Sequence, residues 1–108
     1  MKQWDIFMFD FDEAGPHPAV IVSHDARVSR KQHVNVLLCS SQRATRSPEA
    51  TEVMLNSADG LDWETLCKCD HFYLVPKHRL YRQRGVVSQA RQRQIMQTIW
   101  RSLGFMSH

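Results

Sequence analysis

The run PAVIVS, residues 18–23, is continuously apolar and begins directly after the turn-rich stretch AGPH (14–17). An apolar run of this length that is bounded by turn residues is typical of a buried strand. Pro16 and Pro18 fix the backbone on either side of His17. The sequence therefore predicts a buried strand with a histidine held tightly at its entrance.

Similar runs, rich in aromatic and β-branched residues, lie on both sides of this stretch and predict further strands. They are QWDIFMFDF (3–11), HVNVLLCSS (33–41), TEVMLN (51–56) and TLCKCDHFYLVPK (65–77), the last forming one long bent strand or two short ones. The polar segment HDARVSRKQ (24–32) is expected to be a loop, and HRLYRQRG (78–85) a connector.

The tail of the chain predicts a helix. Ser88 is a good N-cap for the segment 89–103, and Gly104 follows as a stop signal. Ile95 and Ile99 recur on one face of this segment, as expected when a helix packs on a core. Five or six short strands followed by one helix indicate a mainly β fold, a small and strongly bent sheet or barrel that the helix caps.

The chain has 108 residues, which predicts a single domain spanning 1–108. Lys and Arg outnumber Asp and Glu by 14 to 11, an excess that supports nucleic-acid binding only weakly. No acidic residue occurs between Lys77 and Arg101. An acidic partner and a simple solvated basic face both explain this distribution.

Three cysteines cannot form a closed set of disulfides, which favours a reducing compartment. The N-terminus has acids inside its apolar run and does not resemble a signal peptide. No apolar stretch reaches the roughly 20 residues of a membrane span. We therefore expect a cytoplasmic protein without a membrane partner.

A metal or cofactor is not expected. Cys67, Cys69 and His71 project to one face of a strand, but zinc sites space their cysteines by about two to four residues and need four ligands. Buried strand cysteines are the simpler interpretation. The sequence also contains neither a glycine-rich phosphate loop nor a G-x-S-x-G nucleophile motif.

One group of polar residues does suggest chemistry. His17 precedes the second predicted strand, Ser40 and Ser41 end the third, and Arg43 and Arg46 follow. Imidazole, hydroxyl and guanidinium groups together can move a proton and hold a phosphate. By themselves these residues do not favour catalysis over a non-catalytic role.

Four segments resemble the MazF/PemK family of toxin endoribonucleases. They are WDIFMFDF with GPHPAVIVS, VNVLLCSSQ, LCKCDHFYLVPKHRL and RGVVSQARQRQIMQTIWRSLGF, and they run in the family's order from Trp4 to Phe105. The resemblance implies an SH3-like barrel, a homodimer, and cleavage of single-stranded RNA by the ribose 2′-hydroxyl. It also implies a cognate antitoxin whose acidic tail occupies the RNA groove.

The resemblance also assigns roles to residues. The family's catalytic pair, an arginine before the proline of the second strand and a hydroxyl ending the third, falls on His17 and Ser40. Histidine thus stands where the family has arginine, and it serves as a general acid or base. The family's substrate contacts fall on Asp12 and Glu13, which lie in a shortened loop, and on Ser41.

Arg43 and Arg46 are expected to contact RNA, with Arg43 replacing the lost positive charge. Two alternatives stay open. One is a CcdB-like inhibitor of gyrase that acts through the end of the helix near Trp100 and Gly104-Phe105. The other is a binding module with neither activity.

Overall fold

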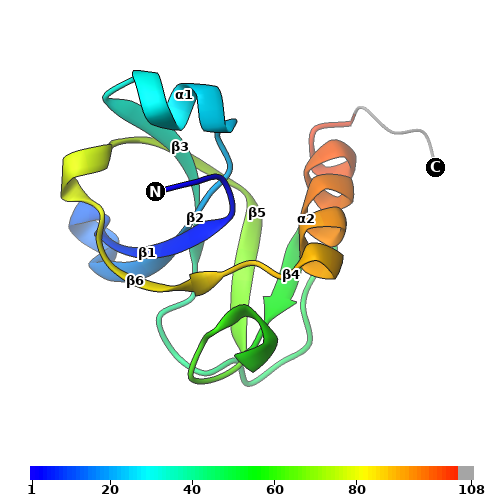
Figure 1. The fold of residues 1–108 in the computed structure, drawn as a ribbon. Coiled ribbons are helices and arrows are strands. Elements are labelled where there is room, and N and C mark those ends of the chain that lie inside the picture. Colours follow the sequence, from blue (N-terminus) through cyan, green and yellow to red (C-terminus); the bar gives the residue numbers. More distant parts are fainter. Residues whose placement is uncertain (105–108) are drawn as a thin grey trace.

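The computed structural model describes residues 1–104, and all of them belong to one curled sheet with its covering helices (Figure 1). The strands are β1 (Asp5–Asp10), β2 (Pro16–Ile21), β3 (His33–Cys39), β4 (Glu52–Leu55), β5 (Thr65–Pro76) and β6 (Tyr81–Val86). The helices are α1 (Asp25–Arg30) and α2 (Gln89–Ser102), with short 3-10 turns η1 (Asp12–Ala14), η2 (Ser57–Asp59) and η3 (Lys77–Arg79).

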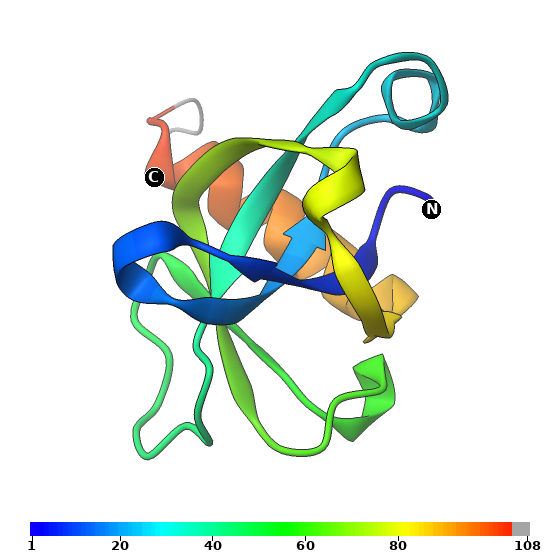
Figure 2. The same cartoon turned by 90° about the vertical axis from the view of Figure 1, so that its left-hand side faces the viewer.

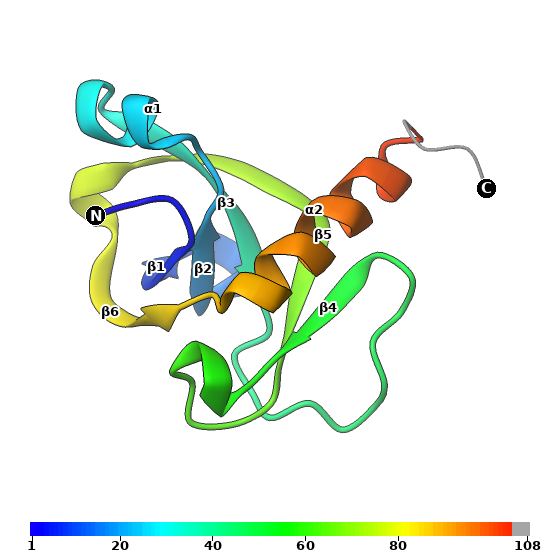
Figure 3. The ribbon, with the colours of Figure 1, turned by 45° about the vertical axis from the view of Figure 1, so that its right-hand side comes forward.

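Every neighbouring pair in the six-stranded sheet is antiparallel, in the order β4-β5-β3-β2-β1-β6. Figure 2 shows how the sheet curls, with the long strand β5 bending between β4 and β3. The helix α2 packs on β4 and β5 (Figure 3). The predicted mainly β fold with a C-terminal helix is confirmed. Among residues 1–104, no helix is both long and apolar enough to cross a membrane.

The sheet buries apolar side chains on both of its faces. The core beneath α2 contains Ile6, Val20, Leu37, Cys39, Val53, Leu55, Leu61, Cys67, Cys69, Val87 and Ile95. The core inside the curl contains Phe9, Phe11, Ala19, Ile21, Val28, Val34, Val36, Leu38, Val75 and Leu80. The strand β2 supplies Val20 to the first core and its neighbours Ala19 and Ile21 to the second, which explains why the run 18–23 is apolar throughout.

The predicted loop over residues 24–32 is wrong, because it contains the helix α1. His24 caps this helix by accepting a hydrogen bond from the amide of Ala26 at 3.0 Å through Nδ1. Val28 is the one buried residue of the helix, so no apolar repeat marks it in the sequence. The remaining side chains of α1 are exposed, and all of them except Ala26 are polar.

The predicted connector over residues 78–85 is also wrong, because it contains the turn η3 and most of β6. Among the described residues, the strand β6 pairs with β1 alone and lies at the edge of the sheet, with shifts in its register. Edge strands expose polar side chains on both faces and therefore lack the alternation that marks half-buried strands. Its Gly85 is required, because a Cβ there would lie 2.1 Å from the carbonyl oxygen of Asp59.

The long segment between β3 and β4 is anchored by a buried carboxylate. The guanidinium of Arg46 donates to Glu52 Oε1 at 2.7 Å and to Oε2 at 2.9 Å, and the ammonium of Lys68 lies 3.1 Å from Oε2. The amide of Glu49 adds a bond of 2.8 Å. The Arg46 guanidinium is the main cause that lowers the pKa of Glu52 from 4.5 to about 2.

This network predicts a specific dependence of stability on acid. Because the pKa of Glu52 is lowered by folding, its contribution to the free energy of unfolding is complete above pH 4.5 and is lost as the pH falls toward 2. We expect Glu52→Gln to be less stable than the wild type at neutral pH and to lose less stability across this range. Urea denaturation at a series of pH values measures both effects, with Glu49→Gln as the control. Parallel curves for Glu52→Gln and the wild type would show that the carboxylate is not stabilised as described.

Candidate active site

His17 and Ser40 meet at one end of the sheet, where β2 begins and β3 has just ended. The register pairs Ala19 with Leu38, and its continuation by two residues sets His17 opposite Ser40. In antiparallel strands, residues that face each other in this way carry neighbouring side chains. The structure therefore brings the two predicted catalytic residues together.

The side chain of His17 completes a hydrogen-bond ladder that Pro18 interrupts. The amide of Val22 donates to the carbonyl of Asn35, so these two residues form a hydrogen-bonded pair of the β2–β3 ladder. Such pairs recur at every second residue of an antiparallel ladder, and positions 18 and 39 are therefore also a hydrogen-bonded pair. Proline has no N–H to donate, which leaves the carbonyl of Cys39 without its ladder partner. Nδ1 of His17 lies 2.7 Å from this carbonyl oxygen and takes the place of the missing donor.

The second ring nitrogen also faces a carbonyl. Nε2 of His17 lies 3.0 Å from the carbonyl oxygen of Ala14 in the preceding turn. A carbonyl oxygen only accepts, and a neutral imidazole carries one N–H, so both contacts are hydrogen bonds only in the imidazolium form. Both ring nitrogens of His17 therefore face backbone acceptors at the entrance of β2.

Aromatic rings support this imidazole from the side of the inner core. The ring of Phe11 lies edge-on to His17 with a centroid distance of 6.1 Å, and to Tyr73 of β5 with a distance of 4.9 Å. Phe11 is buried, whereas Tyr73 is exposed. The imidazole is thus half-buried at the rim of the core, where one face remains open.

Ser40 has its hydroxyl engaged with the neighbouring strand. Its Oγ accepts a hydrogen bond from the amide of Leu66 at 2.9 Å and lies 3.4 Å from the carbonyl of Gln42. The amide of Ser40 donates to the carbonyl of Leu66 at 2.9 Å. Ser40 therefore joins the end of β3 to the start of β5, and its hydroxyl proton makes only the long bond to Gln42.

The acidic residues expected to contact substrate lie in the turn before His17. Asp12 and Glu13 are exposed members of η1, the turn whose Ala14 carbonyl faces the imidazole. Asp12 adopts a left-handed conformation with φ of 48°. Such strain of a non-glycine residue is common at functional turns. Their role in RNA binding stays a prediction.

The three remaining residues that are predicted to contact RNA follow Ser40 in the segment between β3 and β4. They differ in whether their side chains are already engaged by other residues. Ser41 and Arg43 are exposed beside the site, and Arg43 has no hydrogen-bond or ion-pair partner among residues 1–104. The guanidinium of Arg46 instead holds Glu52 with two hydrogen bonds, which raise the pKa of Arg46. Arg43 is therefore the arginine available to a ligand.

A pocket of about 430 Å³ opens next to Arg43, between the segments that flank β4 and β5. Its lining consists of Arg43, Asn56, Ser57, Asp62, Trp63 and Glu64. Sequence reasoning missed these neighbours of Arg43, because residues 57–64 are polar and turn-rich and predict only a connection. The single signal was a tryptophan placed in such a turn.

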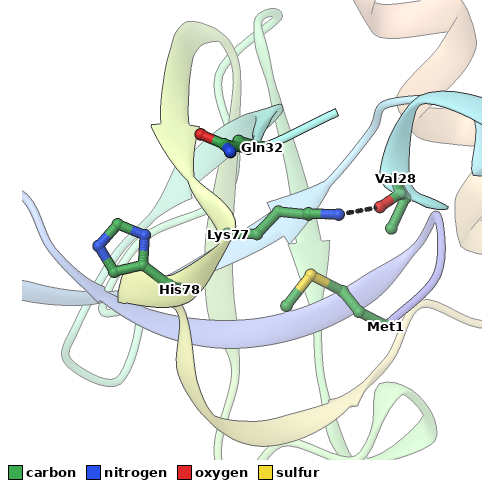
Figure 4. A pocket seen from close by; sticks show the side chains of 5 residues that line it. All are labelled: Met1, Val28, Gln32, Lys77 and His78. Carbon is green, nitrogen blue, oxygen red and sulfur yellow. Dashed lines mark hydrogen bonds between the residues drawn. The ribbon is translucent and has the colours of Figure 1, made fainter. Parts of the chain in front are cut away.

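A larger cavity, of about 610 Å³, lies away from these residues. Met1, Val28, Gln32, Lys77 and His78 line it, and Lys77 donates to the carbonyl of Val28 (Figure 4). It opens between α1 and η3, at the opposite ends of β2 and β3 from His17 and Ser40. Its lining shows no pairing of an acid or base with a nucleophile.

The cysteines form a buried group in the core beneath α2. Cys39, Cys67 and Cys69 are reduced and completely buried. A hydrogen bond with Cys39, together with burial, raises the pKa of Cys67, and a hydrogen bond with Cys67 raises that of Cys69. Thiols with raised pKa values are poor nucleophiles and poor metal ligands. Among residues 1–104, no three metal-ligating side chains converge on one point.

Solved structures share this fold at low sequence identity. An endoribonuclease in complex with its cognate antitoxin from a mycobacterial species superposes with a TM-score of 0.86 at 22% identity, covering 100% of this chain and 99% of the other. Mycobacterium tuberculosis toxin MazF-mt6 gives 0.79 at 21%, covering 92% and 95%. The toxin-antitoxin complex MazE-MazF from Deinococcus radiodurans gives 0.75 at 20%, covering 99% and 97%.

The family comparison covers nearly the whole sequence. No curated protein matches the chain at a significant level. The model of the PemK-like, MazF-like toxins of type II toxin-antitoxin systems matches residues 2–103. The fold agrees with that of the structures named above over nearly the whole of this chain. The chain therefore belongs to the PemK-like, MazF-like family of type II toxins.

Proposed function

We propose that this toxin is a metal-independent endoribonuclease that cleaves single-stranded RNA. The ribose 2′-oxygen attacks the adjacent phosphorus, the bond from phosphorus to the 5′-oxygen breaks, and the products are a cyclic phosphate and a 5′-hydroxyl. The 2′ proton passes to water, and a proton must reach the departing 5′-oxygen. The observation that carries this proposal is the His17 imidazole, held by two carbonyls opposite Ser40.

His17 meets two requirements of this reaction. An imidazolium opposes the negative charge that develops on the phosphate oxygens, as the family's arginine does. Unlike arginine, it can also release a proton to the leaving oxygen. Both ring nitrogens face carbonyls, so action as a general acid or as a general base requires one of these two contacts to open.

The other residues contribute binding and position. The hydroxyl of Ser40 can turn its proton from the long bond to Gln42 toward a phosphate oxygen. Arg43 lies three residues further along, exposed and without a partner among the described residues, and can hold a phosphate. We infer that a cognate antitoxin inhibits the enzyme by placing an acidic tail over these positive groups. This pairing fits a cytoplasmic toxin.

The test of this function compares variants of His17 on single-stranded RNA without added metal and with a chelator present. We expect His17→Ala to lose about 10²- to 10⁴-fold in rate, the usual loss for a general acid or base. His17→Arg should keep part of the activity because it restores charge. Wild-type activity should fall as the pH rises from about 5 to 8, and that of His17→Arg should not follow this decline.

Few other titratable groups lie near His17 and could contribute to the pH dependence of the cleavage rate. The elements beside His17 carry the titratable groups Asp10 of β1, Asp12 and Glu13 of η1, Cys39 of β3 and Tyr73 of β5, and Arg79 of η3 lies over the ring of Phe9, which pairs with His17. None of them forms an ion pair with the imidazole among residues 1–104. His78→Ala, a change at the distant cavity, is the control. Two outcomes would favour the CcdB-like alternative: RNA that stays intact with the wild type, or gyrase-dependent DNA breakage that the variant His17→Ala retains. One residue of that alternative, Phe105, lies outside the described residues.

Pro18 provides a second test that does not remove the imidazole. Pro18→Ala restores an N–H at the ladder position opposite Cys39, where it competes with His17 for the same carbonyl. We expect the imidazole to lose its fixed orientation and the cleavage rate to fall about tenfold or more while the fold is kept. NMR of the imidazole nitrogens detects the change of hydrogen bonding, with Pro48→Ala as control. An unchanged ring signal would show that Pro18 does not position His17.

The predicted homodimer has a suitable surface on β5. Beyond Cys69, whose amide donates to the carbonyl of Thr51, this strand pairs with β3 alone in the described structure. The remaining part of β5 carries Phe72, 40% exposed, and Leu74, 57% exposed. Exposed apolar side chains on an open strand edge favour association. We expect a dimer by light scattering, and a shift toward monomer for the double variant Phe72→Asp, Leu74→Asp. A wild-type mass that stays monomeric at all concentrations would refute this assembly.

A further inference from the structure

The pocket beside Arg43 adjoins the proposed cleavage site directly. Ser40 pairs with Leu66 through its amide and its hydroxyl, and the amide of Ala44 donates to the carbonyl of Glu64 at 2.9 Å. The segment 40–44 therefore runs alongside 64–66. A nucleotide chain that continued from the cleavage site along these segments would reach the pocket. The segments that supply its lining, which connect β3 with β4 and β4 with β5, lie at the end of the molecule drawn lowest in Figure 1.

Trp63 gives this pocket an aromatic surface. It belongs to no core cluster of the described residues, and 38% of it is exposed. A large apolar side chain in a polar turn gains little stability from packing there. Exposed aromatic rings stack unpaired bases in proteins that bind single-stranded nucleic acids.

The charged residues of the pocket are divided between structural and free groups. Asp62 is already paired, because Arg84 lies 2.9 Å from its carboxylate. Within residues 1–104, the carboxylate of Glu64 and the guanidinium of Arg43 have no such partner. One anion and one cation of the pocket lining thus remain for a ligand.

Asn56 adds a donor to this set. Its Oδ1 accepts the amide of Ala58 at 2.9 Å, which fixes the orientation of the side chain and leaves its NH2 group for other partners. The pocket therefore offers a carboxylate that accepts, an amide that donates, and a guanidinium. The Watson–Crick edge of guanine presents two adjacent N–H donors beside one carbonyl acceptor, and no other standard base matches this set as fully.

We propose that this pocket binds a guanine base next to the cleaved phosphate. Trp63 stacks on the base, Glu64 accepts its two N–H groups, Asn56 donates to its carbonyl, and Arg43 holds the adjoining phosphate. The proposal rests on the proposed function, because it assumes that single-stranded RNA passes the site at His17. It goes further by assigning a base preference and by adding Trp63, Glu64 and Asn56 to the substrate contacts.

The experiment uses the full-length protein and two measurements. Cleavage positions are mapped on a pool of random single-stranded RNA. Binding is measured separately with short RNAs in which a 2′-deoxy nucleotide at the cleavage position prevents the reaction. The oligonucleotides carry guanine, adenine, cytosine or uracil at the flanking position, and tryptophan fluorescence reports stacking.

We expect Trp63→Ala to bind the guanine oligonucleotide about 5- to 150-fold more weakly, as for the loss of one stacked base. Trp63→Phe should retain part of this affinity. Glu64→Gln should reduce the preference for guanine about tenfold without a comparable loss for uracil. Glu49→Gln, an exposed carboxylate of the neighbouring segment outside the pocket, should change neither value, and circular dichroism verifies that each variant is folded.

The outcomes separate this proposal from the proposed function. If the wild type cleaves RNA while Trp63→Ala keeps its affinity and cleavage pattern, the base pocket is refuted and the nuclease is not. If the wild type binds the guanine oligonucleotide through Trp63 but cleaves nothing, the nuclease is refuted and the pocket stands. A Trp63-dependent preference for another base would overturn the assignment of guanine, and absence of any RNA binding would overturn both proposals.

Discussion

The hydrogen bond between His17 and the carbonyl of Cys39 joins the fold to the proposed chemistry. It exists because Pro18 occupies a hydrogen-bonding position of the β2–β3 ladder and has no N–H to fill it. A side-chain donor replaces the backbone donor at the same carbonyl. The position of the imidazole is therefore set by the two strands that form the centre of the sheet, and both strands are held by cores on each of their faces.

The parts of the fold that were predictable are those with a local apolar pattern. The run 18–23 and the segment 33–41 are apolar because each strand supplies side chains to two cores, and α2 shows an apolar face at helical spacing. The helix α1 and the strand β6 carry no such pattern. One buries a single residue, and the other lies at the sheet edge. Their structure depends on partners far away in the sequence.

The same distinction applies to the site. His17 and Ser40 could be selected because each stands at the end of a predicted strand, and adjacent strand ends meet. The neighbours of Arg43 could not, because Asn56, Trp63 and Glu64 come from connections whose approach depends on how β4 and β5 pair. The sequence also does not reveal that Arg46 pairs with Glu52. The buried carboxylate of Glu52 accepts a hydrogen bond from each terminal nitrogen of the Arg46 guanidinium.

The two arginines of the β3–β4 segment have different roles: one anchors the backbone of the loop, and the other is available to bind a ligand. Arg46 forms an ion pair with Glu52, and this pair anchors the second half of the segment at the start of β4. The near half is anchored by Ser40 and Ala44 on the start of β5, so Arg43 is held between two fixed points while its own side chain stays free. A guanidinium on a restrained backbone loses less entropy when it binds a phosphate than one on a mobile loop. The proposed reaction site thus combines an imidazole whose two nitrogens face backbone carbonyls with an arginine whose backbone is held by its neighbours.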